Sequence, residues 1–187
     1  MIKPLYCYSV AVFFIFKISM TIKSKRLTIR PLTKADNQFL LELLNSKGWL
    51  DNIGDREVRT TIQSEKYISV ILKKDSLQYM VIEKLDTSIP IGILSFMKRD
   101  QIEYPDFGFA LLPSYHRQGF ALEASLRYLH HLFSNDSKLT IAAICKKENT
   151  PSIHLLEKIG FTFNDILMKD KEPLNLYLLQ KEDLIQK

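Results

Sequence analysis

A short basic segment that contains glycine precedes a helix-forming run, and its residue types suit an anion-binding turn. The segment is RQGFALEA, residues 117–124. A glycine at a loop-to-helix junction lets the backbone approach a ligand closely, and the free N–H groups of the first helical turn point toward that ligand. Those donors and the positive end of the helix dipole favour phosphate. An ordinary helix start has the same composition, so this segment alone leaves both interpretations open.

The composition is that of an ordinary globular protein. The 187 residues fit one domain with a sizeable core, and 46% are hydrophobic and 25% charged. The net charge of +5 is compatible with an anionic ligand or weak nucleic-acid binding, but the Lys and Arg residues are scattered along the chain. Cys7 and Cys145 supply neither a disulfide framework nor a metal-binding spacing. We therefore expect a reducing, cytoplasmic location and no metal.

The N-terminus contains an apolar run from Val10 to Phe16, which Lys17 ends. This run is too short to span a bilayer, and no cleavage site of the A-x-A type follows it. We expect residues 1–22 to be an extension outside the core and residues 23–183 to form a single domain. A membrane-associating tail is the alternative.

Beyond the extension, the pattern of apolar residues predicts alternating strands and helices. RLTIRPL alternates as a strand does, and a helix is expected to begin at Thr33 or Asp36. A second helix is expected from Asp55 to about Leu72, after a loop with the sequence KGWLDNIGD. Three strand-like runs with short turns then predict an antiparallel meander: LQYMVIE, IGILSFM and DFGFALL.

The second half of the chain changes to helix, strand, helix, strand. A helix is expected over residues 119–133, and Glu123 and Arg127 are spaced to pair on its outer face. The nearly unbroken apolar run KLTIAAIC predicts a buried central strand. A further helix in NTPSIHLLEKIGF ends at Gly160, and two closing strands are expected in FTFNDILM and NLYLLQ.

Four segments in this order resemble the GNAT superfamily of acyl-CoA-dependent N-acyltransferases: DFGFALLP, SYHRQGFALEA, KLTIAAIC and ENTPSIHLLEKIGF. The opening RLTIRPLTKAD and the segment NSKGWLDNIGDREV are similar to its RimJ/RimL branch of ribosomal-protein N-terminal acetyltransferases. The resemblance covers about Lys25 to Asp183. It implies a single-domain α+β fold, with a mixed, mostly antiparallel seven-stranded sheet and helices on both faces.

The resemblance also implies acetyl-CoA as co-substrate, with its pyrophosphate on the backbone N–H groups of the turn. The residues implied there are Arg117, Gln118, Gly119, Phe120, Ala121 and Leu122. The family has Gln or Arg at the first position of this turn, where this sequence has His116. Backbone N–H donors carry most of the interaction with pyrophosphate, so the substitution leaves the expected site in place.

Two more segments are implied to contact acetyl-CoA. Phe109, Ala110 and Leu111 would pair with the pantetheine arm as an added strand does. Asn149 matches the family asparagine near the thioester, and a helix cap is the alternative interpretation of that residue.

The chemistry implied is direct attack of a primary amine on the thioester, with a base that takes a proton from the amine. Asp106 matches an acidic position of the family and is a candidate base or amine ligand, with Asp100 and Glu103 as neighbours that could share the role. Ser152 matches a serine that acts on the leaving thiolate, or is only a polar residue in a first helical turn. Asn149 completes the candidate catalytic set.

Two positions depart from the family. Where some relatives carry a tyrosine acid and a glutamate base, this sequence has Leu156 and Ile144. An N-acetyltransferase acting on a protein N-terminus or a small amine is favoured, and a catalytically weak acyl-CoA-binding module is the alternative. Only the tail and the mild positive charge favour a membrane-associated or nucleic-acid-binding protein. We expect a monomer or homodimer whose acceptor lies between the GWLDNIGD segment and the last strands.

Overall fold

The computed structural model describes residues 20–169 and 172–185, so residues 1–19 of the predicted extension lie outside the described residues. The described chain is built on one eight-stranded sheet with the order β1-β2-β3-β4-β5-β6-β8-β7. β5 and β6 are parallel, and every other neighbouring pair of this sheet is antiparallel. The strands are β1 (Ile22–Lys23), β2 (Leu27–Pro31), β3 (Leu77–Lys84), β4 (Pro90–Met97), β5 (Asp106–Leu111), β6 (Ile141–Lys146), β7 (Thr162–Lys169) and β8 (Glu172–Leu179).

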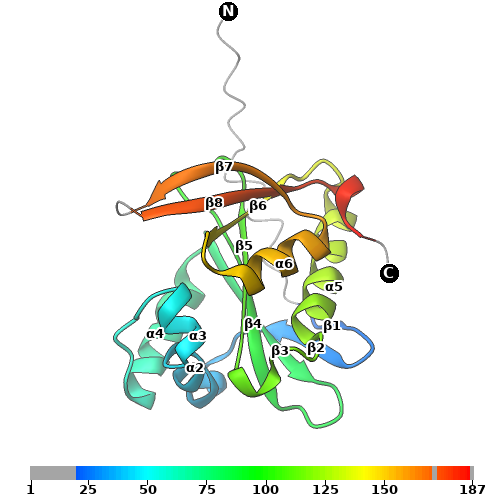
Figure 1. Ribbon diagram of the computed structural model, residues 1–187. Helices are drawn as coiled ribbons and strands as arrows, with labels where there is room; N and C mark the ends of the chain where they lie inside the picture. The colour runs from blue at the N-terminus through cyan, green and yellow to red at the C-terminus, as the bar shows by residue number, and fades with distance from the viewer. Residues whose placement is uncertain (1–19, 170–171, 186–187) are drawn as a thin grey trace, which may run out of the picture.

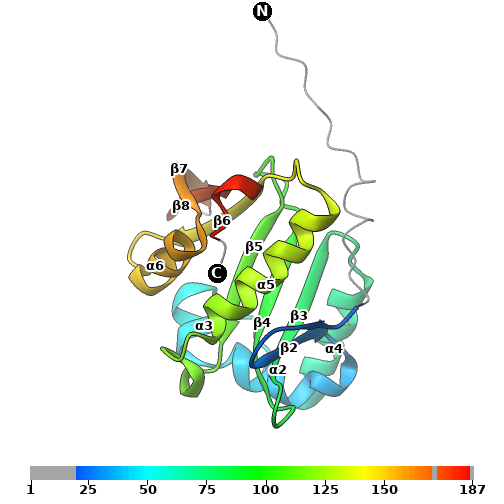
Figure 2. The ribbon, with the colours of Figure 1, turned by 90° about the vertical axis from the view of Figure 1, so that its right-hand side faces the viewer.

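Helices cover both faces of the sheet (Figure 1). One face carries α2 (Asn37–Leu44), α3 (Lys47–Asn52) and α4 (Thr61–Lys73), whose apolar residues pack with β3 and β4. The other face carries α5 (Phe120–Asn135) and α6 (Thr150–Ile159). Figure 2 shows α5 lying across β4 and β5. Three short 3-10 helices, η1 (Lys34–Asp36), η2 (Pro113–Tyr115) and η3 (Lys181–Asp183), complete the described elements.

The predicted fold class is confirmed, with one difference in strand number. β3 to β5 form the predicted antiparallel meander, and β2 extends it by pairing with β3. β6 is the predicted central strand, between β5 and β8. The expectation of seven strands was wrong because Ile22 and Lys23 form an additional edge strand on β2. Two residues are too few to produce an alternating apolar pattern, so this strand has no signal in the sequence.

Two predictions for the first half of the chain were wrong. The KGWLDNIGD segment contains a helix, α3, because Trp49 packs into the core with its indole N–H donating to the Gly54 carbonyl at 3.0 Å. The helix expected from Asp55 begins later, at Thr61. Thr60 and Gln63 satisfy each other's backbone N–H groups at this start, and such a reciprocal cap fixes where a helix begins.

The parallel strands β5 and β6 stay together for a single residue pair, Asp106 opposite Ala142. On its other side, β5 pairs with β4 over its whole length. Beyond Asp106, the edge of β5 that faces β6 therefore has no strand partner in the described sheet. This divergence is the feature on which the candidate site is built.

We predict that Gly160→Ala destabilises the protein by about 2 kcal/mol or more. Gly160 ends α6 at φ 118°, and a Cβ there would lie 2.0 Å from the Asp183 carbonyl oxygen. Gly48→Ala is a matched control, since the nearest atom to a Cβ there is 3.9 Å away and alanine favours a helix by about 0.5–1 kcal/mol. Urea unfolding measures both, and equal stabilities of the two variants would contradict the prediction.

Candidate functional site

Beyond the Asp106–Ala142 pair, the open edge of β5 presents backbone groups without a partner on β6 from Gly108 to Leu111. These groups can hydrogen-bond an extended ligand in the way that an added strand does. The predicted residues Phe109, Ala110 and Leu111 all lie on this edge. Their side chains alternate, with Phe109 and Leu111 toward α5 and α6 and Ala110 toward α2 to α4. The carbonyl of Leu111 already contacts the His116 ring, with 3.0 Å between O and Nε2.

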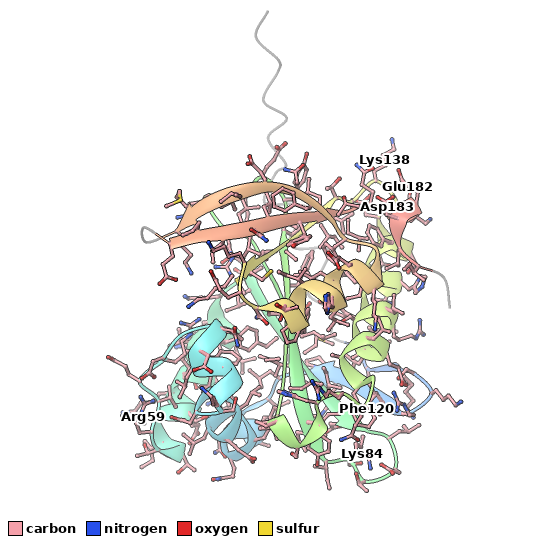
Figure 3. The ribbon with its side chains drawn as sticks, viewed as in Figure 1. Arg59, Lys84, Phe120, Lys138, Glu182 and Asp183 are labelled. Atoms are coloured by element: carbon pink, nitrogen blue, oxygen red, sulfur yellow. The ribbon has the colours of Figure 1, made fainter. Side chains whose placement is uncertain are left out.

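The turn after β5 leads directly into the N-terminus of α5. Gly119 is the N-cap residue and is left-handed at φ 78°, and Arg117 is also left-handed at φ 59°. A left-handed non-glycine residue costs about 1–3 kcal/mol and is found at ligand-binding turns. Phe120, labelled in Figure 3, Ala121 and Leu122 form the first turn of α5, whose backbone N–H groups have no acceptor within the helix. The arrangement suits an anion such as phosphate.

Arg26 contacts this turn, and sequence reasoning missed it. One of its terminal nitrogens donates to the Gln118 carbonyl at 3.0 Å, and its guanidinium lies 4.4 Å from the centre of the Phe120 ring. The other terminal nitrogen lies 3.4 Å from where a Cβ of Gly119 would be. Arg26 therefore brings a positive charge to the turn from a residue that lies far away in sequence, so no local spacing could have indicated it.

Glu123 holds Arg26 in place, and the predicted pairing of Glu123 with Arg127 was wrong. The Glu123 carboxylate accepts from Arg26 Nε at 2.6 Å and from the Ser24 hydroxyl at 2.8 Å. Arg127 instead donates to the Lys23 carbonyl at 2.9 Å. Burial raises the pKa of Glu123, but hydrogen bonds from Arg26 and Ser24 outweigh burial and hold the pKa below its usual range. The first turn of α5 is thus joined to the start of the sheet.

Asp106 is a buried carboxylate at the point where β5 and β6 part. Its exposed fraction is 3%, Oδ2 accepts from Arg99 Nε at 2.6 Å, and Oδ1 has no hydrogen-bond partner among the described residues. Burial raises its pKa to about 6, although the ion pair with Arg99, the backbone N–H of Ile144 and the charge of Lys169 act in the opposite direction. A carboxylate with this pKa and a vacant oxygen can exchange a proton near neutral pH. The sequence indicated Asp106 but not its partner Arg99.

Asp106 lies on the face of the sheet opposite α5 and α6. Because side chains alternate along β5, Gly108 and Ala110 share this face, which we call the Asp106 face. The neighbouring carboxylates Asp100 and Glu103 are exposed, in contrast to Asp106. Of these three acids, only Asp106 combines burial with a vacant oxygen.

Asn149 and Ser152 form the N-terminus of α6, directly after β6. Asn149 Oδ1 accepts from the Ser152 backbone N–H at 3.3 Å, so Asn149 does cap the helix. Its side-chain NH₂ has no acceptor among the described residues, and neither does the half-buried Ser152 hydroxyl. Leu156, one turn further on, is only 2% exposed and belongs to the core.

The remaining candidates contribute little chemistry. Burial raises the pKa of the Cys145 thiol to about 11, which makes it a poor nucleophile at neutral pH. Within residues 20–169 and 172–185, no three His, Cys, Asp or Glu side chains gather in a group able to hold a metal ion. No helix in that part of the chain has the length and apolar character needed to cross a bilayer.

Comparison with known proteins agrees with this geometry. A family profile described as "Acetyltransferase (GNAT) domain" matches residues 26–162. The chain belongs to the GNAT acetyltransferase family. Two Bacillus subtilis relatives named as uncharacterized N-acetyltransferases are similar to it. YnaD is 28% identical over 141 residues, which cover 75% of this chain and 82% of YnaD, and YjdG is 28% identical over 137 residues, which cover 71% and 79%.

Solved GNAT structures share the fold. An acetyltransferase of the GNAT family from Bacillus anthracis superposes with a TM-score of 0.74 at 24% identity, covering 87% of this chain and 99% of that one. RimL, the ribosomal L7/L12 acetyltransferase, solved with coenzyme A, gives 0.74 at 17% identity, covering 86% and 98%. Spermidine N-acetyltransferase from Vibrio cholerae, solved with CoA and spermine, gives 0.73 at 18% identity, covering 86% and 98%. At these identities the similarity establishes the fold alone.

We predict that Glu123→Gln destabilises this GNAT protein by about 1–2 kcal/mol at pH 7 and has little effect well below pH 4. Folding lowers the pKa of the Glu123 carboxylate from 4.5, so the ionised carboxylate stabilises the folded protein at pH values above 4.5. This stabilisation is lost as the pH falls through the pKa of the folded state. Urea unfolding at several pH values measures it, with the exposed Glu157→Gln as control. A destabilisation that does not change with pH would contradict the prediction.

Proposed function

We propose that this protein transfers the acetyl group of acetyl-CoA to a primary amine in a ternary complex. The observation that carries the proposal is the continuity of two binding features: residues 112–118 join the open edge of β5 directly to the N-terminus of α5 at Gly119. An extended arm followed by a pyrophosphate matches these two features in that order. The CoA bound to RimL and to the spermidine N-acetyltransferase supports the same choice of ligand.

The residues of this chain fit acetyl-CoA. The backbone N–H groups of residues 117–122 would hold the pyrophosphate, and Arg26 would add a positive charge at that turn. The edge at Phe109, Ala110 and Leu111 would pair with the pantetheine arm. Acetyl-CoA supplies an acetyl group activated as a thioester. Open backbone N–H groups of β5 would orient that group and polarise its carbonyl.

Asp106 would accept the proton that the attacking amine must lose. Its free Oδ1 takes this proton, directly or through a water molecule, and the nitrogen lone pair becomes available. A bond then forms between nitrogen and the acetyl carbon, and the carbon–sulfur bond breaks. The Ser152 hydroxyl would donate a proton to the leaving thiolate and regain one, through water, from the nitrogen, which must lose its second proton to become an amide. The Asn149 amide would position the arm beside Ser152.

The RimJ/RimL branch and a cytoplasmic location remain proposals. The branch rests on the segments RLTIRPLTKAD and NSKGWLDNIGDREV and is compatible with the fold shared with RimL. The location rests on the cysteine content. The proposed domain boundary after residue 22 rests on the sequence pattern, and β1 (Ile22–Lys23) crosses it.

The alternative is a catalytically weak acyl-CoA-binding module, and one observation favours it. The position at which some family members carry a tyrosine acid holds Leu156, which is part of the core. Release of free thiol from acetyl-CoA, followed with a panel of N-terminal peptides and small amines, separates the two functions. Release that depends on the acceptor supports the enzyme. Tight binding of acetyl-CoA with no release for any amine supports the module.

We predict that Asp106→Asn lowers kcat/KM by about 100-fold to 10,000-fold and removes a rise in activity with pH. In the unmodified enzyme, kcat/KM should rise as the pH passes through about 6, because only the deprotonated carboxylate accepts a proton. Ionisation of the amine gives a second rise at higher pH, in both proteins. Asp100→Asn, at an exposed neighbouring carboxylate, should keep both rises. An unchanged pH profile in Asp106→Asn would exclude Asp106 as the base.

We predict that Ser152→Ala lowers kcat by about 100-fold and leaves the KM for acetyl-CoA nearly unchanged. The substitution keeps the backbone N–H that Asn149 binds, so the start of α6 is retained. Ser152→Thr, which keeps a hydroxyl, is the control and should recover most of the activity. Steady-state kinetics of thiol release would refute the role if the alanine variant turned over as fast as the unmodified enzyme.

A further inference from the structure

The charged groups that act most directly on Asp106 are cationic. Arg99 binds its Oδ2 at 2.6 Å. Burial raises the pKa of Asp106, while Arg99 and Lys169 lower it. Lys169 lies at the end of β7, two residues after Leu167, which packs with Ala142 on the Asp106 face. Because side chains alternate along a strand, Lys169 projects on that face too.

The positive region extends from the buried carboxylate toward β3. Tyr79 lies in one cross-strand row with Ser95 and Gly108, so it shares the Asp106 face. Burial raises the pKa of the Tyr79 phenol, and Arg56 and Arg99 both act in the opposite direction. Arg99 therefore acts on two groups of this face, and Arg56 acts on Tyr79 from the segment between α3 and α4.

Carboxylates of β7 and β8 on this face are already engaged. The Glu172 carboxylate lies 3.6 Å from Lys146 Nζ. Asp165 Oδ1 accepts from the backbone N–H of Ile166 at 2.7 Å. Among the described residues, no ion pair joins either acid to Arg99, whereas Glu172 stands directly opposite Lys169 on the neighbouring strand. Arg99, whose only carboxylate partner is Asp106, is therefore the least compensated cation of the region among the described residues.

We propose that the acceptor is a primary amine that also carries a carboxylate, and that Arg99 and Lys169 recognise this carboxylate while Asp106 receives the amine. The inference rests on the proposed acetyl transfer and names the substrate class of its acceptor side. It covers a free amino acid and a peptide with an acidic residue near its N-terminus, since both present the same two groups.

The geometry of Arg99 supports this division of roles. Its Nε binds Asp106, and its terminal nitrogens have no carboxylate partner among the described residues. A guanidinium presents its donors as a planar fork that matches a carboxylate. Asp106 Oδ1 is the vacant acceptor beside it. A polyamine would bring a second cation against Arg99 and Lys169, and like charges in one site select against such a ligand.

Three amines of similar length test the proposal. β-Alanine, β-alaninamide and 1,3-diaminopropane carry a carboxylate, a neutral amide and a second amine at corresponding positions. We expect kcat/KM for acetylation to be about tenfold lower for β-alaninamide than for β-alanine, mainly because KM is higher. For 1,3-diaminopropane we expect a still lower kcat/KM. The amide has the less basic amine, so amine reactivity works against this order. The peptides Ser-Asp-Gly and Ser-Asn-Gly, compared in the same assay, distinguish peptide from free amino acid.

Variants and an inhibitor give independent measurements. Lys169→Gln, which removes no hydrogen bond to Asp106, should lower the ratio of kcat/KM for β-alanine to kcat/KM for β-alaninamide about threefold. Arg99→Gln should abolish the preference between them. Lys138→Gln removes the same charge at an exposed position between α5 and β6, labelled in Figure 3, and should change neither value. Propionate should compete with β-alanine, and propionamide should not.

The possible outcomes separate this inference from the proposed function. Preference for the carboxylated amine, lost in the Arg99 variant and competed by propionate, supports it. Equal or better acetylation of β-alaninamide or 1,3-diaminopropane would overturn the substrate class while leaving acetyl transfer intact. Absence of thiol release with every amine, despite binding of acetyl-CoA, would overturn the proposed function and the acceptor class with it.

Discussion

One parallel residue pair, Asp106 opposite Ala142, determines the geometry of the whole site. Antiparallel pairing with β4 keeps β5 straight and fully bonded on one side, while β6 turns away to pair with β8. The backbone groups left open on β5 are exposed polar groups that need a partner, and an extended ligand can supply it. Had the two strands remained paired, the sheet would be closed and no extended ligand could add to β5.

The same divergence determines the electrostatics of Asp106. The carboxylate lies where the strands still meet, so neighbouring strands remove it from water, and its pKa rises to about 6 despite the ion pair with Arg99. Arg99 binds only Oδ2 of Asp106, so Oδ1 has no hydrogen-bond donor among the described residues. A buried unsatisfied oxygen is unfavourable for stability, and such atoms are retained where function requires them. The face that Asp106 shares with Arg99 and Lys169 is therefore both the reactive and the selective part of the proposed acceptor site.

On the opposite face, Arg26 and Glu123 connect the first strands to the start of α5. The pair fixes the first helical turn against the sheet, and it holds a guanidinium at the left-handed turn around Gly119. An anion-binding turn depends on fixed N–H directions, because a mobile loop would lose entropy on binding. The stability of the first turn and the charge presented there thus depend on one long-range contact.

Local patterns in the sequence determined much of this protein. The meander, the central strand, the helix after Gly119 and the stop at Gly160 follow from apolar periodicity and from glycine at left-handed positions, which are properties of neighbouring residues. The short strand β1 was missed because two residues are too few to show an alternating pattern. Helix α3 was missed because the packing of Trp49 into the core, rather than a local sequence pattern, determines it. The ordered motifs also indicated the turn and Asp106. Only the tertiary structure decided that Arg26 reaches the turn at Gly119, that Arg99 binds Asp106, and that Lys169 shares the face of Asp106. The physical reason is that these residues lie on different strands and loops. Their spacing along the chain does not indicate which charged side chains the folded sheet brings together.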